Sequence, residues 1–213
     1  MFVTLEGPEG SGKTTHISPL AAFLRQQGYK VFTTREPGGT SIGDQIRKVI
    51  LDQNNTEIHP RTEALLLQAS RAQLVEQVIR PHLKKGFLVI SDRYADSTIA
   101  YQGYGHQINL QQLQIIISFA TGGLRPDLTV LLDIEAEEGL RRRTNEGNWN
   151  RLDAQNLAFH QRVREGYLQL AKNEPERWVI INASRPINQV QADIRRVILE
   201  RLKLEPVTQP INH

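Results

Sequence analysis

The sequence predicts an α/β fold in which one five-stranded parallel sheet is covered by helices on both faces. Short apolar runs typical of buried strands alternate along the chain with longer stretches that have helical spacing. Consecutive runs are separated by enough residues for a crossover helix, which parallel strands require. A Gly-x-x-x-x-Gly-Lys-Thr sequence at residues 7–14 follows the first run directly.

Each element follows from its own pattern. The apolar runs predict strands at residues 2–5, 30–34, 87–91, 128–133 and 178–181. Helical spacing predicts helices near residues 15–27, 41–51, 62–84, 109–121, 136–145, 153–173 and 187–203. In the first helix Ile17, Leu20 and Leu24 recur on one face, and Gly28 provides a stop signal.

Composition is that of an ordinary globular protein. The 213 residues suit one domain, which we expect at 1–205, followed by a flexible tail at 206–213 with two prolines. No cysteine is present, which excludes disulfides and thiolate chemistry. A net charge of +3 does not indicate nucleic-acid binding. No signal peptide or membrane-length apolar run is evident, so we expect a cytoplasmic protein without membrane contact.

The glycine-rich sequence is typical of a phosphate-binding loop between a strand and a helix. Glycines allow successive backbone N–H groups to surround an anionic oxygen, and the following helix adds its positive N-terminal dipole. Lys13 is expected to reach the β- and γ-phosphates, and Thr14 a magnesium ion. The residues expected to bind ATP are Gly7, Pro8, Glu9, Gly10, Ser11, Gly12, Lys13, Thr14 and Thr15. The alternative is a glycine-rich turn that binds nothing.

Two polar segments follow the second and third strands, so they should lie beside this loop at the carboxyl edge of the sheet. In the segment 34–40, Arg35 can pair with a second phosphate; a surface ion pair is the alternative. In the segment 91–94, Asp92 can hold magnesium and Arg93 can bind a phosphate with two hydrogen bonds. Asp92 could instead cap the next helix and pair with Arg93.

An arginine cluster lies at residues 141–143, and a turn-rich stretch leads from it to Arg151. Successive residues of a helix are about 100° apart, so at most two of the three clustered arginines can face one phosphate chain. A charge run is usually a solvated face, and this alternative stays open for Arg142 and Arg143.

Taken together, these motifs resemble the thymidylate kinase family over residues 2 to about 200. The resemblance rests on residues 5–15, the Arg-Glu-Pro-Gly-Gly-Thr sequence at 35–40, Ser-Arg-Ala-Gln at 70–73, Asp-Arg-Tyr at 92–94 with residues 97–103, and Pro-Asp-Leu-Thr at 126–129, in that order. It implies a three-layer P-loop kinase fold with a small mobile lid at about 136–152. The loop centre Glu-Gly-Ser lacks an arginine, as in bacterial members whose lid supplies it.

The resemblance implies transfer of the ATP γ-phosphoryl group to dTMP, giving dTDP and ADP, with Mg²⁺ between Thr14 and Asp92. The residues implied in catalysis are Lys13, Arg93 and the lid arginines Arg142, Arg143 and Arg151. Those implied in substrate binding are Glu9, Arg35, Glu36, Leu67, Arg71, Arg93, Thr98, Tyr101 and Gln102. Among these, Arg71, Thr98 and Gln102 would contact the thymine edge, whereas Tyr101 and Glu9 would lie near the sugar. Tyr101 could equally be a packing aromatic and Glu9 a solvated residue.

Two positions depart from the family pattern. Leu67 stands where a phenylalanine usually stacks on thymine, so the identity of the acceptor nucleotide is left open. Asn145 and Glu146 stand in the lid where basic residues often continue, so the catalytic lid arginine is left open.

Other functions remain as alternatives. A GTP-driven switch would need an Asn-Lys-x-Asp sequence, and the chain has none. A nucleic-acid-dependent ATPase would need a larger basic surface, so no nucleic-acid partner is expected. A kinase for another nucleoside monophosphate is the nearest alternative. The family resemblance also implies a homodimer through the helices near 62–84 and 109–121, although Ile115, Ile116 and Ile117 could be ordinary core.

Overall fold

The computed structural model describes residues 1–147 and 149–204, and its central feature is a five-stranded parallel sheet. The strands lie in the order β2-β3-β1-β4-β5. All five predicted strands are confirmed within one residue at each end: β1 (Phe2–Glu6), β2 (Val31–Arg35), β3 (Leu88–Asp92), β4 (Leu128–Asp133) and β5 (Trp178–Asn182). β1, β3 and β4 are almost entirely buried, which explains why they are continuous apolar runs.

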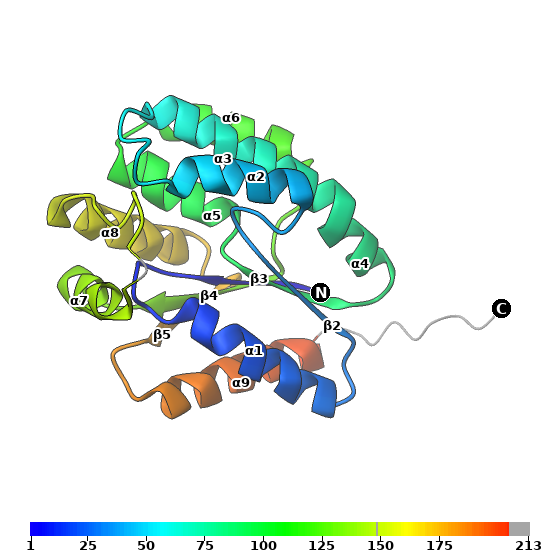
Figure 1. The fold of residues 1–213 in the computed structure, drawn as a ribbon. Coiled ribbons are helices and arrows are strands. Elements are labelled where there is room, and N and C mark those ends of the chain that lie inside the picture. Colours follow the sequence, from blue (N-terminus) through cyan, green and yellow to red (C-terminus); the bar gives the residue numbers. More distant parts are fainter. Residues whose placement is uncertain (148, 205–213) are drawn as a thin grey trace.

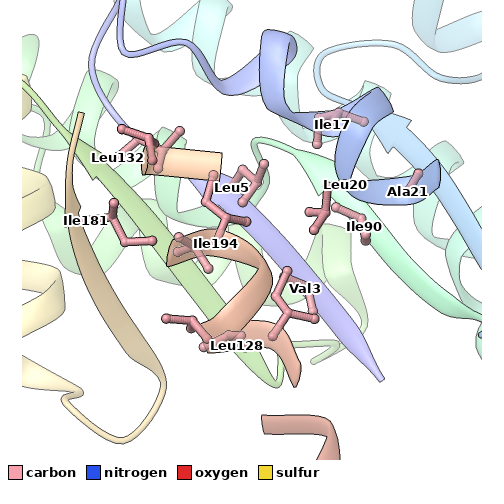
Figure 2. Packing of buried hydrophobic residues seen from close by; sticks show 14 of the residues in the cluster. Val3, Leu5, Ile17, Leu20, Ala21, Ile90, Leu128, Leu132, Ile181 and Ile194 are labelled. Atoms are coloured by element: carbon pink, nitrogen blue, oxygen red, sulfur yellow. The ribbon is translucent and has the colours of Figure 1, made fainter. Parts of the chain in front are cut away.

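Helices cover both faces of the sheet, as predicted (Figure 1). One face carries α1 (Lys13–Gln26) and α9 (Ile187–Leu204). Their apolar side chains, including Ile17, Leu20 and Ile194, interlock with Val3 and Leu5 of β1 (Figure 2). This cluster is the largest buried core among the described residues and fixes the direction in which α1 leaves the loop after β1.

Most of the other helices cover the opposite face (Figure 1). They are α2 (Ser41–Leu51), α3 (Pro60–Leu74), α4 (Arg80–Lys84), α5 (Ala95–Thr98), α6 (Leu110–Thr121) and α8 (Leu157–Asn173). The predicted helix at 62–84 is one helical run whose regular hydrogen bonding is interrupted by a π-helical segment, η1 (Val75–Ile79). Pro81 lies just beyond η1 and has no N–H for a regular helical bond, which accounts for the wider turn.

One helical segment was absent from the sequence prediction. α5 continues into a second π-helical segment, η2 (Ile99–Gly105), which packs extensively against α8. Gly103, Gly105 and β-branched Thr98 and Ile99 are poor helix formers, so local propensity gives no helix signal there. Tertiary packing stabilises the segment instead, since Tyr101 is buried against Phe159 and Tyr167 of α8.

α7 (Ala136–Glu146) lies beside the phosphate loop, with which it makes a close backbone contact. A Cβ on Gly10 would lie 2.0 Å from the carbonyl oxygen of Gly139, and one on Gly139 would lie 2.2 Å from that of Glu9. Only glycine permits both approaches. The segment predicted as a lid therefore begins in direct contact with the loop. The expected tail at 206–213 lies outside the described residues, and none of the described helices has the length and apolarity needed to cross a membrane.

Candidate active site

The first three strands bring the predicted motifs to one edge of the sheet. Leu5 of β1 pairs with Asp92 of β3, so the loop at 7–12 starts beside the end of β3. The Thr14 hydroxyl, in the first turn of α1, donates to Asp92 Oδ2 at 2.5 Å. A hydroxyl and a carboxylate separated by 78 residues in sequence thus lie in contact.

A cavity of about 430 Å³ opens at this edge. It is lined by most of the residues predicted from the sequence: Glu9, Gly10, Gly12, Lys13, Thr14, Thr15, Arg35, Glu36, Leu67, Arg71, Asp92, Arg93, Thr98, Tyr101, Gln102 and Arg143. We call it the first cavity. Its walls contain acidic, basic and aliphatic side chains. Such a mixture suits a ligand with a charged end and an uncharged ring.

Lys13 follows the phosphate loop, and its side chain folds back onto the loop. Its ammonium group donates to the Gly7 and Pro8 carbonyls and to Ser11 Oγ at 2.8–3.0 Å. Burial lowers the pKa of Lys13 to about 8, and the positive charge of Arg93 adds to this effect. An anionic phosphate at the loop would restore the charged form, which makes this lysine well matched to such a ligand.

Arg93 projects into the first cavity from a strained backbone. Its φ of +68° is unusual for a residue with a Cβ and is typical of functional sites. The guanidinium donates to Glu9 Oε1 at 2.8 Å and to the Tyr101 hydroxyl at 3.0 Å, and it lies over the Tyr101 ring. Burial raises the pKa of Glu9, but the charges of Arg93 and Lys13 outweigh this effect and hold it at about 2. Glu9 is therefore ionised and forms an ion pair with Arg93. Without this pair, the Arg93 guanidinium could bind an external anion.

A buried carboxylate is linked to Arg93 through two shared hydrogen-bond partners, Ser97 and Tyr167. Glu6 accepts hydrogen bonds from the Tyr94 N–H at 2.7 Å, Ser97 Oγ at 2.6 Å and the Tyr167 hydroxyl at 3.0 Å. Burial raises the pKa of Glu6 to about 7. Glu6 was not predicted as a site residue, because nothing in its local pattern distinguishes it from an ordinary acidic residue at the end of a strand.

The thymine-contacting arginine implied by the resemblance is deeply buried. Arg71 has 1% of its surface exposed and forms a bidentate pair with Glu36. Its other N–H groups donate to Gln68 Oε1, Thr98 Oγ1 and the Tyr94 carbonyl. All five N–H donors of the guanidinium thus have protein acceptors. A base carbonyl would have to share one of them.

Thr98 and Gln102 offer a complementary donor and acceptor. Thr98 Oγ1 accepts from both Arg71 and Gln68, which uses its two lone pairs and leaves its hydroxyl proton to donate. Gln102 Nε2 donates to Glu63 at 2.6 Å, whereas its Oε1 is buried with no hydrogen-bond partner in the part of the chain that the structure describes. A buried acceptor without a partner is costly unless a ligand supplies the donor.

The three lid arginines lie in three different places. Arg143 lines the first cavity and pairs with Asp153 at 3.0 Å. Arg142 donates to Glu138 and to the Ala183 carbonyl and lines a second cavity. Arg151 is buried and pairs with Glu63 and the Ile50 carbonyl, and it lines neither cavity. The structure therefore does not bring the three guanidinium groups together.

The second cavity, of about 300 Å³, adjoins the same loop. It shares Gly10, Gly12 and Thr15 with the first and is otherwise lined by Ser11, His16, Arg142, Ala183, Arg185, Ile187 and Val190. Apart from Ser11 and Arg142, these residues outside the loop were not predicted as site residues. His16 follows the loop in α1, whereas Ala183, Arg185, Ile187 and Val190 lie near the start of α9, far from any motif in sequence. The phosphate loop is thus the common wall of two cavities.

Thr14 and Asp92 fit a magnesium ion that is held mainly by a ligand. Both offer oxygen atoms, which Mg²⁺ prefers. No group of three or more His, Asp or Glu side chains capable of holding a metal occurs in residues 1–147 and 149–204. Two protein oxygens would leave most of an octahedral shell to phosphate oxygens and water.

Comparisons with known proteins identify the family of the chain. A family model described as thymidylate kinase matches residues 5–194. The chain belongs to the thymidylate kinase family. It is 49% identical to a thymidylate kinase of Roseiflexus sp. (strain RS-1), over 93% of each chain, and 50% identical to one of Deinococcus radiodurans, over 94% of this chain and 97% of the relative. A crystal structure of thymidylate kinase from Ehrlichia chaffeensis has a TM-score of 0.76 and 32% identity, over 93% and 98% of the two chains.

In this thymidylate kinase family member, Leu67 lines the first cavity, and its contact with a base stays a prediction. Arg47 of α2 also lines this cavity and was not predicted as a site residue. Its guanidinium donates to the Pro37 carbonyl at 2.8 Å. Burial lowers the pKa of Arg47, and the nearby Arg35 contributes. Sequence reasoning overlooked Arg47 because it sits in the middle of an ordinary amphipathic helix.

Proposed function

We propose that the chain catalyses transfer of the γ-phosphoryl group of ATP to dTMP, giving dTDP and ADP. The observation that carries the proposal is the position of the phosphate loop between two cavities, each large enough for part of a nucleotide. In-line transfer requires a donor and an acceptor to approach the same cationic centre from opposite sides. Membership of the thymidylate kinase family supports the same reaction.

ATP is proposed to bind across the phosphate loop. Backbone N–H groups and Lys13 would bind the β- and γ-phosphates, and the second cavity would hold the remainder of the nucleotide between Arg142 and the start of α9. Mg²⁺ would lie at Thr14 and Asp92 and would neutralise part of the phosphate charge. Arg143 is the lid arginine best placed to approach the γ-phosphate, because it lines the first cavity; Arg151 could do so only if it left Glu63.

dTMP is proposed to bind in the first cavity. Its phosphate would replace Glu9 on Arg93, with Arg35 beside it, so that the acceptor oxygen faces the loop. Tyr101 and the released Glu9 would then lie near the deoxyribose. The thymine ring would lie against Leu67, with its O4 near Thr98 and its N3–H at the free Oε1 of Gln102. A cytosine in this position would present a bare nitrogen to an acceptor.

A homodimer is proposed to form through α3 and α6. Phe119 and Ile115 of α6 are 90% and 70% exposed, and Leu65 of the adjacent α3 is 58% exposed. Ile116 and Ile117 instead pack into a core cluster, so only part of the apolar run is available to a partner. Exposed apolar side chains of this size are typical of an interface. A cytoplasmic location stays a prediction from the sequence.

The decisive experiment is coupled ADP release with ATP and Mg²⁺, comparing dTMP, dUMP, dCMP, AMP and GMP as acceptors. A preference for dTMP that Arg93→Ala removes would support the reaction and the phosphate-binding role of Arg93. ADP release without any acceptor dependence would contradict the proposal.

A further inference from the structure

A buried carboxylate next to the base end of the first cavity has no role in the site described above. Glu63 of α3 has no exposed surface. Its Oε1 accepts the hydrogen bond from Gln102 Nε2 at 2.6 Å, and its Oε2 pairs with Arg151. His106 Nε2 lies 3.4 Å from Oε1, as a contact rather than a hydrogen bond. Glu63 thus connects the cavity wall with the segment that follows α7.

The charge state of Glu63 determines which way the Gln102 amide faces. Although burial raises the pKa of Glu63, the neighbouring His106 and Arg151 outweigh this effect and lower it. An ionised carboxylate only accepts hydrogen bonds, so it must face the NH₂ group of the amide. The reversed amide would place two acceptor oxygens in contact, with no proton between them. The oxygen of Gln102 is therefore the amide atom left for a molecule in the cavity.

We propose that Glu63 is a positioning residue for acceptor selection. Its carboxylate holds the Gln102 amide with Oε1 available to the cavity, so that the site favours a base with an N–H at ring position 3 and disfavours one with a bare nitrogen there. The inference rests on the proposed function and adds a residue that does not itself line the cavity. Glu63 acts only through Gln102.

Arg151 completes the arrangement from the other side. It is 7% exposed and anchored by its hydrogen bond to the Ile50 carbonyl at 3.0 Å, so it compensates the buried charge of Glu63. Its contribution is to the stability of the pair. Loss of Arg151 should therefore weaken the fold and favour a protonated Glu63, which could donate to the Gln102 oxygen.

The test compares two acceptors that differ only on the edge that Gln102 would contact. dTMP carries an N–H at position 3 and an oxygen at position 4, whereas 5-methyl-dCMP carries a bare nitrogen and an amino group. In Glu63→Gln the new amide can donate or accept, so the Gln102 amide can turn. We expect the ratio of kcat/KM for dTMP over 5-methyl-dCMP to fall on the order of tenfold, with the KM for ATP unchanged. An unchanged ratio would overturn the inference.

Two further comparisons separate positioning from a structural role. Asp133→Asn is the matched control, because it removes a carboxylate from the bidentate pair with Arg164, at 2.8 and 2.9 Å, and Asp133 lines neither cavity. It should leave the ratio unchanged. In a Gln102→Leu background, adding Glu63→Gln should have no further effect on the ratio; a further fall would contradict action through Gln102.

If Glu63→Gln does not fold because Arg151 is left unpaired, Glu63→Gln/Arg151→Met removes both charges. The acceptor ratio should then fall in the double variant relative to wild type, and equal ratios would overturn the inference. A wild-type protein that prefers dTMP keeps the proposed function whatever these variants show. A wild-type protein inactive with dTMP would overturn the proposed function, and the inference with it.

Discussion

Replacement of Gly139 by alanine has two opposing effects: a higher helix propensity favours the variant, and a clash with the backbone of the phosphate loop disfavours it. Gly139 lies in the interior of α7, where alanine is normally better than glycine by about 1 kcal/mol. The added Cβ would lie 2.2 Å from the carbonyl oxygen of Glu9 and 3.4 Å from Ile134. The first distance is more than 1 Å short of an ordinary contact, and the atom it meets is backbone that cannot rotate away.

The free-energy cost of the clash should exceed the gain in helix propensity. Overpacking of this kind typically costs about 1–3 kcal/mol, so we expect Gly139→Ala to reduce the free energy of unfolding by about 1 kcal/mol in net terms. The larger effect should be on activity, because relief of the clash moves Glu9 and the loop N–H groups away from the phosphates. A displacement of about 1 Å can lower the rate about 100-fold.

Urea unfolding and coupled ADP release at saturating dTMP would measure the two effects. Asn145→Ala is the control, since Asn145 is exposed on the same helix and the change improves propensity alone. It should raise stability slightly and leave kcat/KM for ATP unchanged. A Gly139→Ala protein that is more stable than wild type and fully active would refute the reasoning.

Three other predictions follow from the site. ATP binding at pH 8 should take up a fraction of a proton, because Lys13 has a pKa of about 8 in the free protein and phosphate would raise it; at pH 6 this uptake should vanish. Calorimetry in two buffers of different ionisation enthalpy measures it, and no uptake at pH 8 would contradict the assignment. Leu67→Phe should lower the KM for dTMP about two- to tenfold by ring stacking, with the KM for ATP unchanged; a higher KM for dTMP would mean that Leu67 does not lie under the base. Glu36→Gln should reduce the free energy of unfolding by about 3–5 kcal/mol in urea titrations, because Arg71 is left buried and unpaired, and Glu36→Gln/Arg71→Met should recover part of it. A negligible loss in the single variant would mean that water reaches the pair.

Local pattern determined the strands, most of the helices and the motifs at the sheet edge. The buried strands are continuous apolar runs, and Gly-x-x-x-x-Gly-Lys-Thr requires a specific backbone. Parallel strands bring the residues that follow them to one edge, so the proximity of Thr14 and Asp92 could be anticipated from sequence alone. The helical segment at 95–105 could not, because packing against α8 forms it despite poor helix propensity.

Only the tertiary structure decided which polar side chains face a cavity and which pair with one another. Arg142, Arg143 and Arg151 are similar residues in one short stretch, yet they lie at the second cavity, at the first cavity and in a buried pair with Glu63. The position of a long, flexible side chain depends on partners that are distant in sequence, such as Ala183 and Ile50. Sequence patterns define where the backbone goes, whereas buried charges are placed by the partners that compensate them, and those partners meet only in the folded chain.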